Sequence, residues 1–280
     1  EQKTSLNNIT IEPADYAETI SINIYHANIK SGSVRFSDWN RKGTSFSLEN
    51  STLDNVRVEG DAVKGSVNIK NNNFNNNSTF QCAYCNYHVP GKGEFIATGN
   101  KFNQNSELYI RGNTKFKKVT INDNEFNQNS YGLRLNLDND SWSNNKENKG
   151  YEVLRNKFTK AYTGIEVKYG KYVINDNIFI ESPGIVYEGY YESHKFEIKG
   201  NFFSKLKGDY AISNKRIWSG KGDQATITDN MFCSSSKVAL RISTNPNSNI
   251  VAGKNYWNTT DETHIKNYMI YDHFNDLNIK

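Results

Sequence analysis

An all-β protein whose chain winds repeatedly as a solenoid is the fold class that the sequence predicts, from three observations. Asparagine accounts for 42 of the 280 residues, and this residue is disfavoured inside helices and favoured in turns. A short pattern of Asn, any residue and an aromatic recurs along most of the chain. Apolar and polar residues alternate before each copy, as expected of strands that bury one face.

The composition excludes several other classes. Aromatic residues make up 13% of the chain, which indicates a folded protein rather than a disordered one. No apolar run approaches the roughly 18 residues of a membrane span, so no membrane insertion is predicted. The net charge is only +4 and the charges are interspersed, so no nucleic-acid partner is predicted. The chain begins at Glu1 without Met or a hydrophobic signal segment, which is expected of a mature or a trimmed chain.

The repeated asparagines define the length of one coil. Successive copies are 28, 24, 32, 21, 24, 29 and 25 residues apart. The asparagines are Asn72, Asn100, Asn124, Asn156, Asn177, Asn201, Asn230 and Asn255. A propeller blade needs about four strands in about 40 or more residues, whereas this period holds two or three short strands. The sequence therefore predicts a single-stranded, right-handed parallel β-helix of about ten coils with a short C-terminal capping helix.

Each residue type in the repeat has a physical reason. Asn at one fixed point of every coil can stack into a ladder of side-chain amides along the axis. The Gly, Asp or Asn that usually precedes it tolerates the left-handed backbone of a tight turn. The aromatic residue two positions after the Asn is expected to point inward and stack on its copies.

The two ends are expected to differ from the repeat within one domain. Residues 1–60 are predicted to form irregular first coils or an N-terminal cap, residues 61–257 the regular coils, and residues 258–280 a C-terminal cap. The segment Thr260–Phe274 has apolar residues at helical spacing, with Thr260 as the expected N-cap. This helix is expected to cover the open end of the solenoid.

The repeats resemble those of the right-handed parallel β-helix superfamily with pectate-lyase-like coils, over residues 20–257. The segment 255–261 resembles the last coil of many bacterial β-helix proteins. The resemblance implies the fold and leaves the activity open, because this fold carries lyases, hydrolases, epimerases, tailspikes and non-catalytic adhesins. The segment that begins at Arg241 lacks the second arginine of the pectate lyase motif, and the polygalacturonase-like motifs are absent.

Several coils carry insertions after their second strand, and these are rich in aromatic residues. The predicted ligand-binding residues of the insertions are Trp142, Tyr190, Tyr191, His194 and Trp218. Insertions at one point of a repeat emerge on one side of the rod. Exposed rings beside carboxylates and amides suit a polysaccharide, because sugar C–H faces stack on rings. The alternative is that Trp142 and Trp218 fold back over the edge of the core.

The second strands also present a row of outward ionisable residues. Glu166, Lys168 and Glu188 are expected on adjacent coils about 5 Å apart. Lys168, Glu188 and Arg241 are candidate catalytic residues, because a lyase needs a base beside a uronate and paired carboxylates serve glycoside hydrolysis. Glu166 and Arg134 are counted as ligand-binding residues. The alternative is an ordinary solvated strand face with cross-strand charge pairs.

Three cysteines and five histidines carry little further signal. Cys82 and Cys85 form a C-x-x-C pair whose alternatives are a local disulfide, two free thiols, or half of a zinc site that would need ligands such as His26 and His88. The histidines show no metal spacing, so neither a metal nor a cofactor is predicted.

These observations favour a secreted or cell-surface protein, with the periplasm as an alternative, that binds polysaccharide or another surface ligand through the aromatic loops on one side of the solenoid, without chemistry. The predicted partner is a polysaccharide or cell-surface glycan. The first alternative is a polysaccharide lyase, glycoside hydrolase or epimerase. The second alternative is a structural component of a fibre or tailspike.

Overall fold

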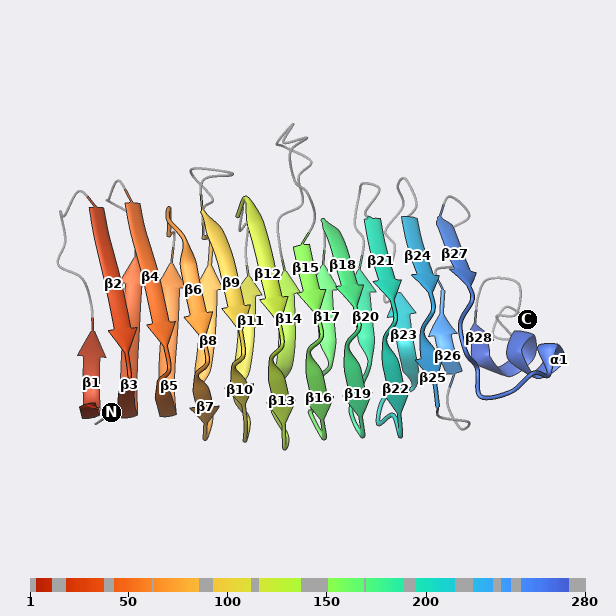
Figure 1. Ribbon diagram of the computed structural model, residues 1–280, viewed down its shortest axis with the longest axis horizontal. Helices are drawn as coiled ribbons and strands as arrows, with labels where there is room; N and C mark the ends of the chain where they lie inside the picture. The colour runs from red at the N-terminus through yellow and green to blue at the C-terminus, as the bar shows by residue number, and fades with distance from the viewer. Residues whose placement is uncertain are drawn as a thin grey trace, which may run out of the picture.

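The structure is a computed structural model. It describes residues 4–11, 19–37, 43–61, 63–85, 93–111, 116–136, 151–168, 170–188, 195–214, 224–233, 238–242 and 248–271. Over these residues the chain forms an 18-stranded and a 10-stranded sheet around one hydrophobic core (Figure 1). All pairings between the strands are parallel, so the predicted all-β parallel solenoid is confirmed.

The 10-stranded sheet faces the viewer in Figure 1 and is called the front sheet. Its strands are β2 (Thr19–Tyr25), β4 (Gly43–Glu49), β6 (Val67–Lys70), β9 (Glu94–Thr98), β12 (Lys118–Asn122), β15 (Tyr151–Leu154), β18 (Lys171–Asn175), β21 (Lys195–Lys199), β24 (Gln224–Thr228) and β27 (Asn249–Gly253). Each strand pairs with its copy in the next coil, so Ile121 lies beside Val153 and Val153 beside Ile174.

The 18-stranded sheet is called the back sheet, and it holds a short and a longer strand from most coils. The short strands are β7 (Asn73–Asn75), β10 (Lys101–Phe102), β13 (Glu125–Asn127), β16 (Lys157–Thr159), β19 (Ile178–Ile180), β22 (Phe202–Ser204) and β25 (Met231–Phe232). The longer strands are β8 (Thr79–Ala83), β11 (Glu107–Arg111), β14 (Gly132–Asn136), β17 (Ile165–Lys168), β20 (Ile185–Glu188), β23 (Tyr210–Asn214) and β26 (Val238–Arg241). The remaining strands are β1 (Thr4–Ile11), β3 (Ala27–Ser37), β5 (Thr52–Asp61) and β28 (Ile270–Tyr271).

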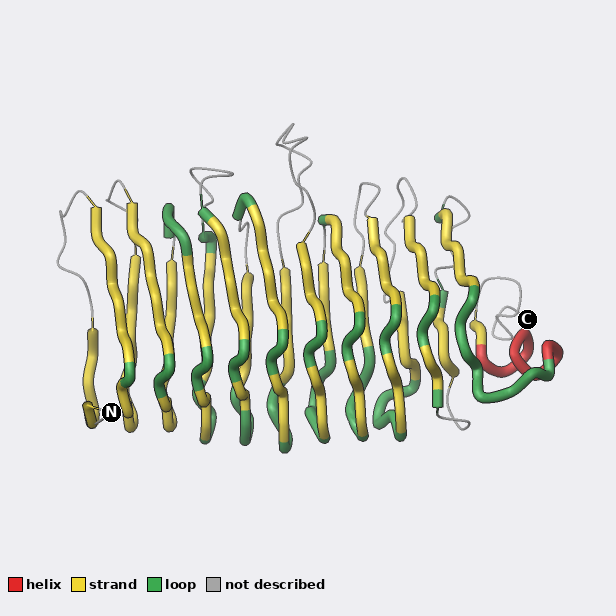
Figure 2. Tube along the Cα trace, viewed as in Figure 1, coloured by secondary structure: helices red, strands yellow, loops and turns green. Residues whose placement is uncertain are grey.

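The coils wind with a right-handed sense. In Figure 1 the front strands run downward and the longer back strands run upward while the chain advances from left to right. The tight turn between each front strand and the following short strand recurs at the same height in successive coils (Figure 2). This regularity places side chains that are far apart in the sequence in columns along the axis, as parallel pairing requires.

The predicted asparagine ladder is present at this turn. The Asn156 Oδ1 accepts hydrogen bonds from the backbone N–H and the side-chain amide of Asn124, at 3.0 and 2.9 Å. Equivalent side-chain bonds join all eight asparagines from Asn72 to Asn255. The ladder therefore makes seven turns, fewer than the ten coils expected of the whole chain, and the front sheet extends beyond it by the N-terminal coils.

The residue before each ladder asparagine adopts a positive φ, as predicted. The angle is 67° at Gly99 and 58° at Asp123, where the residue type favours it. Arg155 and Lys254 occupy the same place with φ of 53° and 54°, although neither residue type prefers this region. At Arg155 and Lys254 the backbone conformation of the turn is therefore set by the ladder and the two sheets, and not by the preference of the residue itself.

The predicted stack of aromatic residues is present in the interior of the solenoid, next to the ladder. Its rings are Phe74, Phe102, Phe126, Phe158, Phe179, Phe203, Phe232 and Trp257. Phe158 lies between Phe126 and Phe179 with centroid distances of 4.7 and 4.8 Å. The seven phenylalanines are buried, so the stack forms the continuous axis of the hydrophobic core.

The first coils belong to the same sheets as the regular ones, and the expected boundary near residue 60 coincides with no break in either sheet. What changes is the side chain at the ladder position. The Ser51 N–H donates to Asn72 Oδ1 at 2.9 Å, and the Ser51 hydroxyl accepts from the Ala27 N–H at 3.0 Å. A serine therefore continues the ladder toward the N-terminus.

The C-terminal helix is shorter than predicted. It consists of α1 (Glu262–His264) and one π-helical turn, η2 (Ile265–Met269). The N-cap is Asp261 rather than Thr260, because the Asp261 carboxylate accepts from the Thr263 and His264 N–H groups. The helix ends before Phe274 because β28 pairs with β26. Figure 1 shows this helix at the C-terminal end of the solenoid, where a cap was expected.

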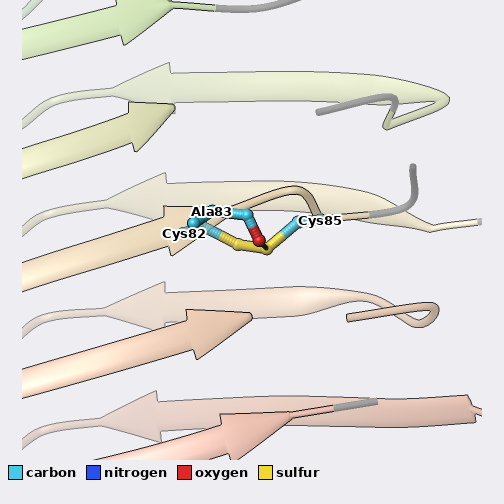
Figure 3. The surroundings of a disulfide bond; sticks show 3 residues. All are labelled: Cys82, Ala83 and Cys85. Carbon is cyan, nitrogen blue, oxygen red and sulfur yellow. Dashed lines mark hydrogen bonds between the residues drawn. A yellow bond between two sulfur atoms is a disulfide. The ribbon is translucent and has the colours of Figure 1, made fainter. Parts of the chain in front are cut away.

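The C-x-x-C pair is a disulfide between Cys82 and Cys85 (Figure 3). Cys82 lies in β8 and Cys85 just beyond its end, and both are fully buried. Cys233 is a free thiol. In the part of the chain that the structure describes, no helix is long and apolar enough to cross a membrane.

Candidate functional site

The outer face of the back sheet carries the ionisable residues that the sequence predicts. Parallel register aligns one column of outward side chains across the longer strands: Gln81, Tyr109, Arg134, Glu166, Val186, Ser213 and Arg241. A second column beside it contains Asn136, Lys168 and Glu188. The alternation of buried and outward residues in each strand produces these columns, as the sequence pattern indicates.

Lys168 is the centre of one group of charges. Its ammonium lies 3.1 Å from Glu188 Oε2 on the next coil and 3.7 Å from Glu166 Oε1 on its own strand. Its side chain is only 30% exposed, and those of Glu166 and Glu188 are less exposed still. Both carboxylates engage the Lys168 ammonium in ion pairs, whereas a lyase base would have to face the substrate proton instead.

Arg134 is the centre of a second group, one coil earlier. Its Nε and Nη2 both donate to Glu107 Oε1, and its guanidinium lies 4.4 Å from the centre of the Tyr109 ring. The register explains this geometry, because Glu107 and Tyr109 on β11 lie beside Gly132 and Arg134 on β14. We refer to Glu107, Arg134, Glu166, Lys168 and Glu188 together as the charged cluster.

Glu107 has a perturbed acidity. Its side chain is only 12% exposed, and this burial raises the pKa of the Glu107 carboxyl above its ordinary value. The charge and the hydrogen bond of Arg134 lower the pKa and the Glu166 carboxylate raises it, and the pKa remains raised overall. The charged cluster therefore joins a carboxyl of raised pKa to a second carboxylate on the same face.

Replacing Glu107 with glutamine is expected to change stability in a pH-dependent way. A raised pKa in the folded protein means that this carboxyl favours the fold fully below its unfolded value of 4.5 and loses that contribution as pH rises through the folded pKa. Glutamine does not titrate. The unfolding free energy of Glu107→Gln relative to the native protein should therefore be higher at pH 7 than at pH 4, as measured by urea unfolding. A relative stability that falls over this interval would show that Arg134 outweighs burial.

Glu107 is a residue that the sequence reasoning missed. In the sequence the alternation of this coil is visible in Leu108, Tyr109 and Ile110 and predicts a strand that starts at Leu108, whereas β11 begins one residue earlier. The available signal was the alternation itself, because a residue two positions before the outward Tyr109 points outward as well.

Two exposed tyrosines were also missed. Tyr131 and Tyr162 lie in the turns before β14 and β17, at the start of these two strands. They are 46% and 53% exposed, and their ring centroids are 5.7 Å apart. Gly132 makes the turn after Tyr131 tight, with φ of 70° and room for no side chain, since a Cβ would lie 2.1 Å from the Thr163 carbonyl oxygen.

The structure does not bring all three candidate catalytic residues together. Lys168 and Glu188 are in contact, whereas Arg241 is on β26, two strands beyond the Glu188 strand β20. The Arg241 guanidinium lies 5.3 Å from the Tyr210 ring and 5.9 Å from the Tyr271 ring. The five predicted loop residues, Trp142, Tyr190, Tyr191, His194 and Trp218, lie outside the described residues.

Among the residues that the structure describes, no group of three or more His, Cys, Asp or Glu side chains could hold a metal ion. Comparison with known proteins yields no family, because no family model, curated protein or solved structure matches the chain. The fold and its outer face thus define a parallel β-solenoid protein with an asparagine ladder.

Proposed function

We propose that the protein binds a polysaccharide or another cell-surface glycan through the outer face of the back sheet, without a chemical step. The observation that carries this proposal is the charged cluster, which spans β11 to β20 and lies in the same coils as the exposed Tyr131 and Tyr162. Sugar C–H faces stack on such rings. Carboxylates and cationic side chains supply acceptors and donors for sugar hydroxyls. Trp142, Tyr190, Tyr191, His194 and Trp218 belong to the same proposal as loop contacts.

The way the charges are paired supports binding without chemistry. Each carboxylate of the charged cluster has a cationic partner within it. A side chain held in such a pair is well placed to orient a ligand hydroxyl, and it is less suited to give or take a proton during a reaction. This arrangement supports binding over the lyase role of Lys168.

The proposed location is outside the cell or at its surface, with the periplasm as an alternative. The Cys82–Cys85 disulfide supports it, because disulfides persist mainly in oxidising compartments. Membership of the pectate-lyase-like superfamily is part of the same proposal and is supported by the ladder, the aromatic stack and the right-handed coils.

Binding is expected to depend on the two exposed tyrosines. The variant Tyr131→Ala/Tyr162→Ala should weaken glycan binding by about tenfold or more, because it removes both stacking surfaces. A glycan array would identify the ligand, and titration calorimetry would give the dissociation constants. Tyr25→Ala is the matched control, since Tyr25 is 50% exposed at the end of a front strand.

Two results would contradict the binding proposal. The absence of any bound glycan across a broad array would overturn it. Equal weakening by Tyr131→Ala/Tyr162→Ala and by Tyr25→Ala would also count against it, because the back sheet would then have no special role.

A glycoside hydrolase is the second candidate, and one observation favours it. Burial raises the pKa of the Glu107 carboxyl, and the Glu166 carboxylate two coils away on the same face adds to that rise. In glycoside hydrolysis one carboxyl protonates the leaving oxygen while the other attacks the sugar or activates water. Arg134 holds the Glu107 carboxylate and opposes the acid role, so this candidate ranks second.

Incubation with acidic and neutral polysaccharides separates the two candidates. A hydrolase would release reducing ends, and a lyase would also release unsaturated products that absorb ultraviolet light. Activity that Glu107→Gln abolishes while glycan binding persists would replace the binding proposal with the enzymatic one. No release from any substrate that the protein binds would exclude the enzyme.

A further inference from the structure

The front sheet has a hollow of its own near the C-terminal end of the solenoid. It has a volume of about 360 Å³ and lies over β18, β21, β24 and β27, which are adjacent at the right of the front sheet in Figure 1. One side consists of the strand-start column Lys171, Lys195, Gln224 and Asn249. The other consists of the column Val173, Glu197, Thr226 and Val251.

Two lysines on one side of this hollow oppose each other directly. Lys171 and Lys195 are register partners on β18 and β21, and both are exposed. Like charges in this position destabilise a sheet by mutual repulsion. Neither lysine forms an ion pair within the part of the chain that the structure describes. Elsewhere on the same sheet Lys118 reaches Glu152 at 3.2 Å, and Lys199 reaches Asp229 at 3.7 Å.

The carboxylate nearest in sequence does not neutralise the two lysines. Glu197 lies two residues after Lys195 on the same face of β21 and lines the hollow. Its Oε1 accepts a hydrogen bond from the Asn175 side-chain amide at 3.0 Å, an interaction at the far end of the neighbouring strand. One side of the hollow therefore carries two positive charges. The carboxylate on the other side, Glu197, is hydrogen-bonded to Asn175.

We propose that this hollow binds the anionic group of an acidic saccharide, with its carboxylate or sulfate between Lys171 and Lys195. The two lysines are register partners on neighbouring strands, whose backbones are roughly 4.8 Å apart. Both ammonium groups can therefore reach one such anion. Gln224, Asn249 and Thr226 supply donors and acceptors for hydroxyl groups. Val173 and Val251 offer apolar surface to the face of a ring. The volume is within the lower range of small-ligand sites, which suits a short saccharide segment.

This site is separate from the face of the proposed glycan site. The hollow is on the front sheet, whereas the charged cluster and the two exposed tyrosines are on the back sheet and its turns. The protein would therefore hold acidic saccharides at the front independently of glycans at the back. The two proposals can fail separately, because no residue is shared between them.

The test uses calorimetric titration of the full chain with three probes: a uronate oligosaccharide, a sulfated oligosaccharide and a neutral oligosaccharide of equal length. We expect the native protein to bind at least one acidic probe and to bind the neutral probe more weakly. Lys171→Gln/Lys195→Gln should weaken acidic binding by about tenfold or more, since it removes two charge-assisted contacts. The matched control is Lys157→Gln/Lys205→Gln, which changes the net charge equally at exposed lysines outside the hollow.

The outcomes decide the proposal in both directions. Selective loss in Lys171→Gln/Lys195→Gln, with unchanged binding in Lys157→Gln/Lys205→Gln and in Tyr131→Ala/Tyr162→Ala, would support the hollow. Equal loss in both lysine pairs would overturn it and show only net-charge attraction. Failure of both acidic probes to bind would overturn it as well. Binding of inorganic sulfate as tightly as the sulfated probe would overturn the assignment to a saccharide.

Discussion

Replacing Asn156 with alanine is expected to lower the free energy of unfolding by about 2–4 kcal/mol, because it orphans buried polar groups on the neighbouring coil. The Asn156 Oδ1 is the acceptor for the backbone N–H of Asn124, and its Nδ2 donates to the Ile121 carbonyl oxygen at 2.8 Å. Asn156 is fully buried, so water cannot take over these bonds. The same truncation at the partly exposed Asn255 should cost less.

Urea unfolding followed by circular dichroism measures this difference. The matched control is Lys157→Ala, the next residue along the chain, whose exposed side chain should contribute within about 0.5 kcal/mol. A cost for Asn156→Ala no larger than that for Lys157→Ala would mean that the ladder follows from the coils and does not stabilise them.

The ladder was predictable from sequence because its chemistry is the same in every copy. One amide per coil, at a nearly constant place between two alternating strands, leaves few arrangements other than a stack. The limits of the rule are visible at Ser51, where a hydroxyl continues the hydrogen bonding to Ala27. No pattern of Asn residues could reveal that extension, since the bond depends on the backbone position that the later coils impose.

The candidate site was only partly predictable for a different reason. Alternation places Glu166, Lys168 and Glu188 on one face, but it does not predict which of these side chains form ion pairs with one another. The contact of Arg134 with Glu107, which are 27 residues apart in the chain, depends on the register between β11 and β14. An error of one residue at the start of β11 was enough to hide Glu107, because strand boundaries leave little trace in the residue pattern.

The C-terminal helix shows the same limit at the level of the fold. Helical spacing between Ile265 and Asp272 predicted a helix as far as Phe274. In the structure Ile270 instead pairs with Leu240 and extends the back sheet by one short strand. Leu240 is 30 residues earlier in the sequence, and its strand offers backbone hydrogen bonds that compete with the helix. The helix propensity of the local sequence contains no information about such a distant partner.

Truncating Phe158 to alanine is expected to lower the free energy of unfolding by about 3–5 kcal/mol, a range typical of a buried aromatic residue. Its ring is fully buried and stacks on two neighbours with interplanar angles of 3° and 6°. The cavity would open in the middle of the stack, where the coils on both sides hold the backbone in place and limit collapse. The cost should therefore lie toward the upper part of the range.

Two companion variants separate cavity formation from the loss of ring stacking. Phe158→Leu keeps most of the apolar volume and should cost clearly less than Phe158→Ala. Ile178→Ala truncates a side chain that is 38% exposed on the outer face of the next coil, and it should cost least of the three. If Phe158→Leu proved as costly as Phe158→Ala, ring-to-ring geometry would outweigh filled volume as the source of stability along the axis. If Ile178→Ala matched Phe158→Ala, the aromatic stack would not be the core that holds successive coils together.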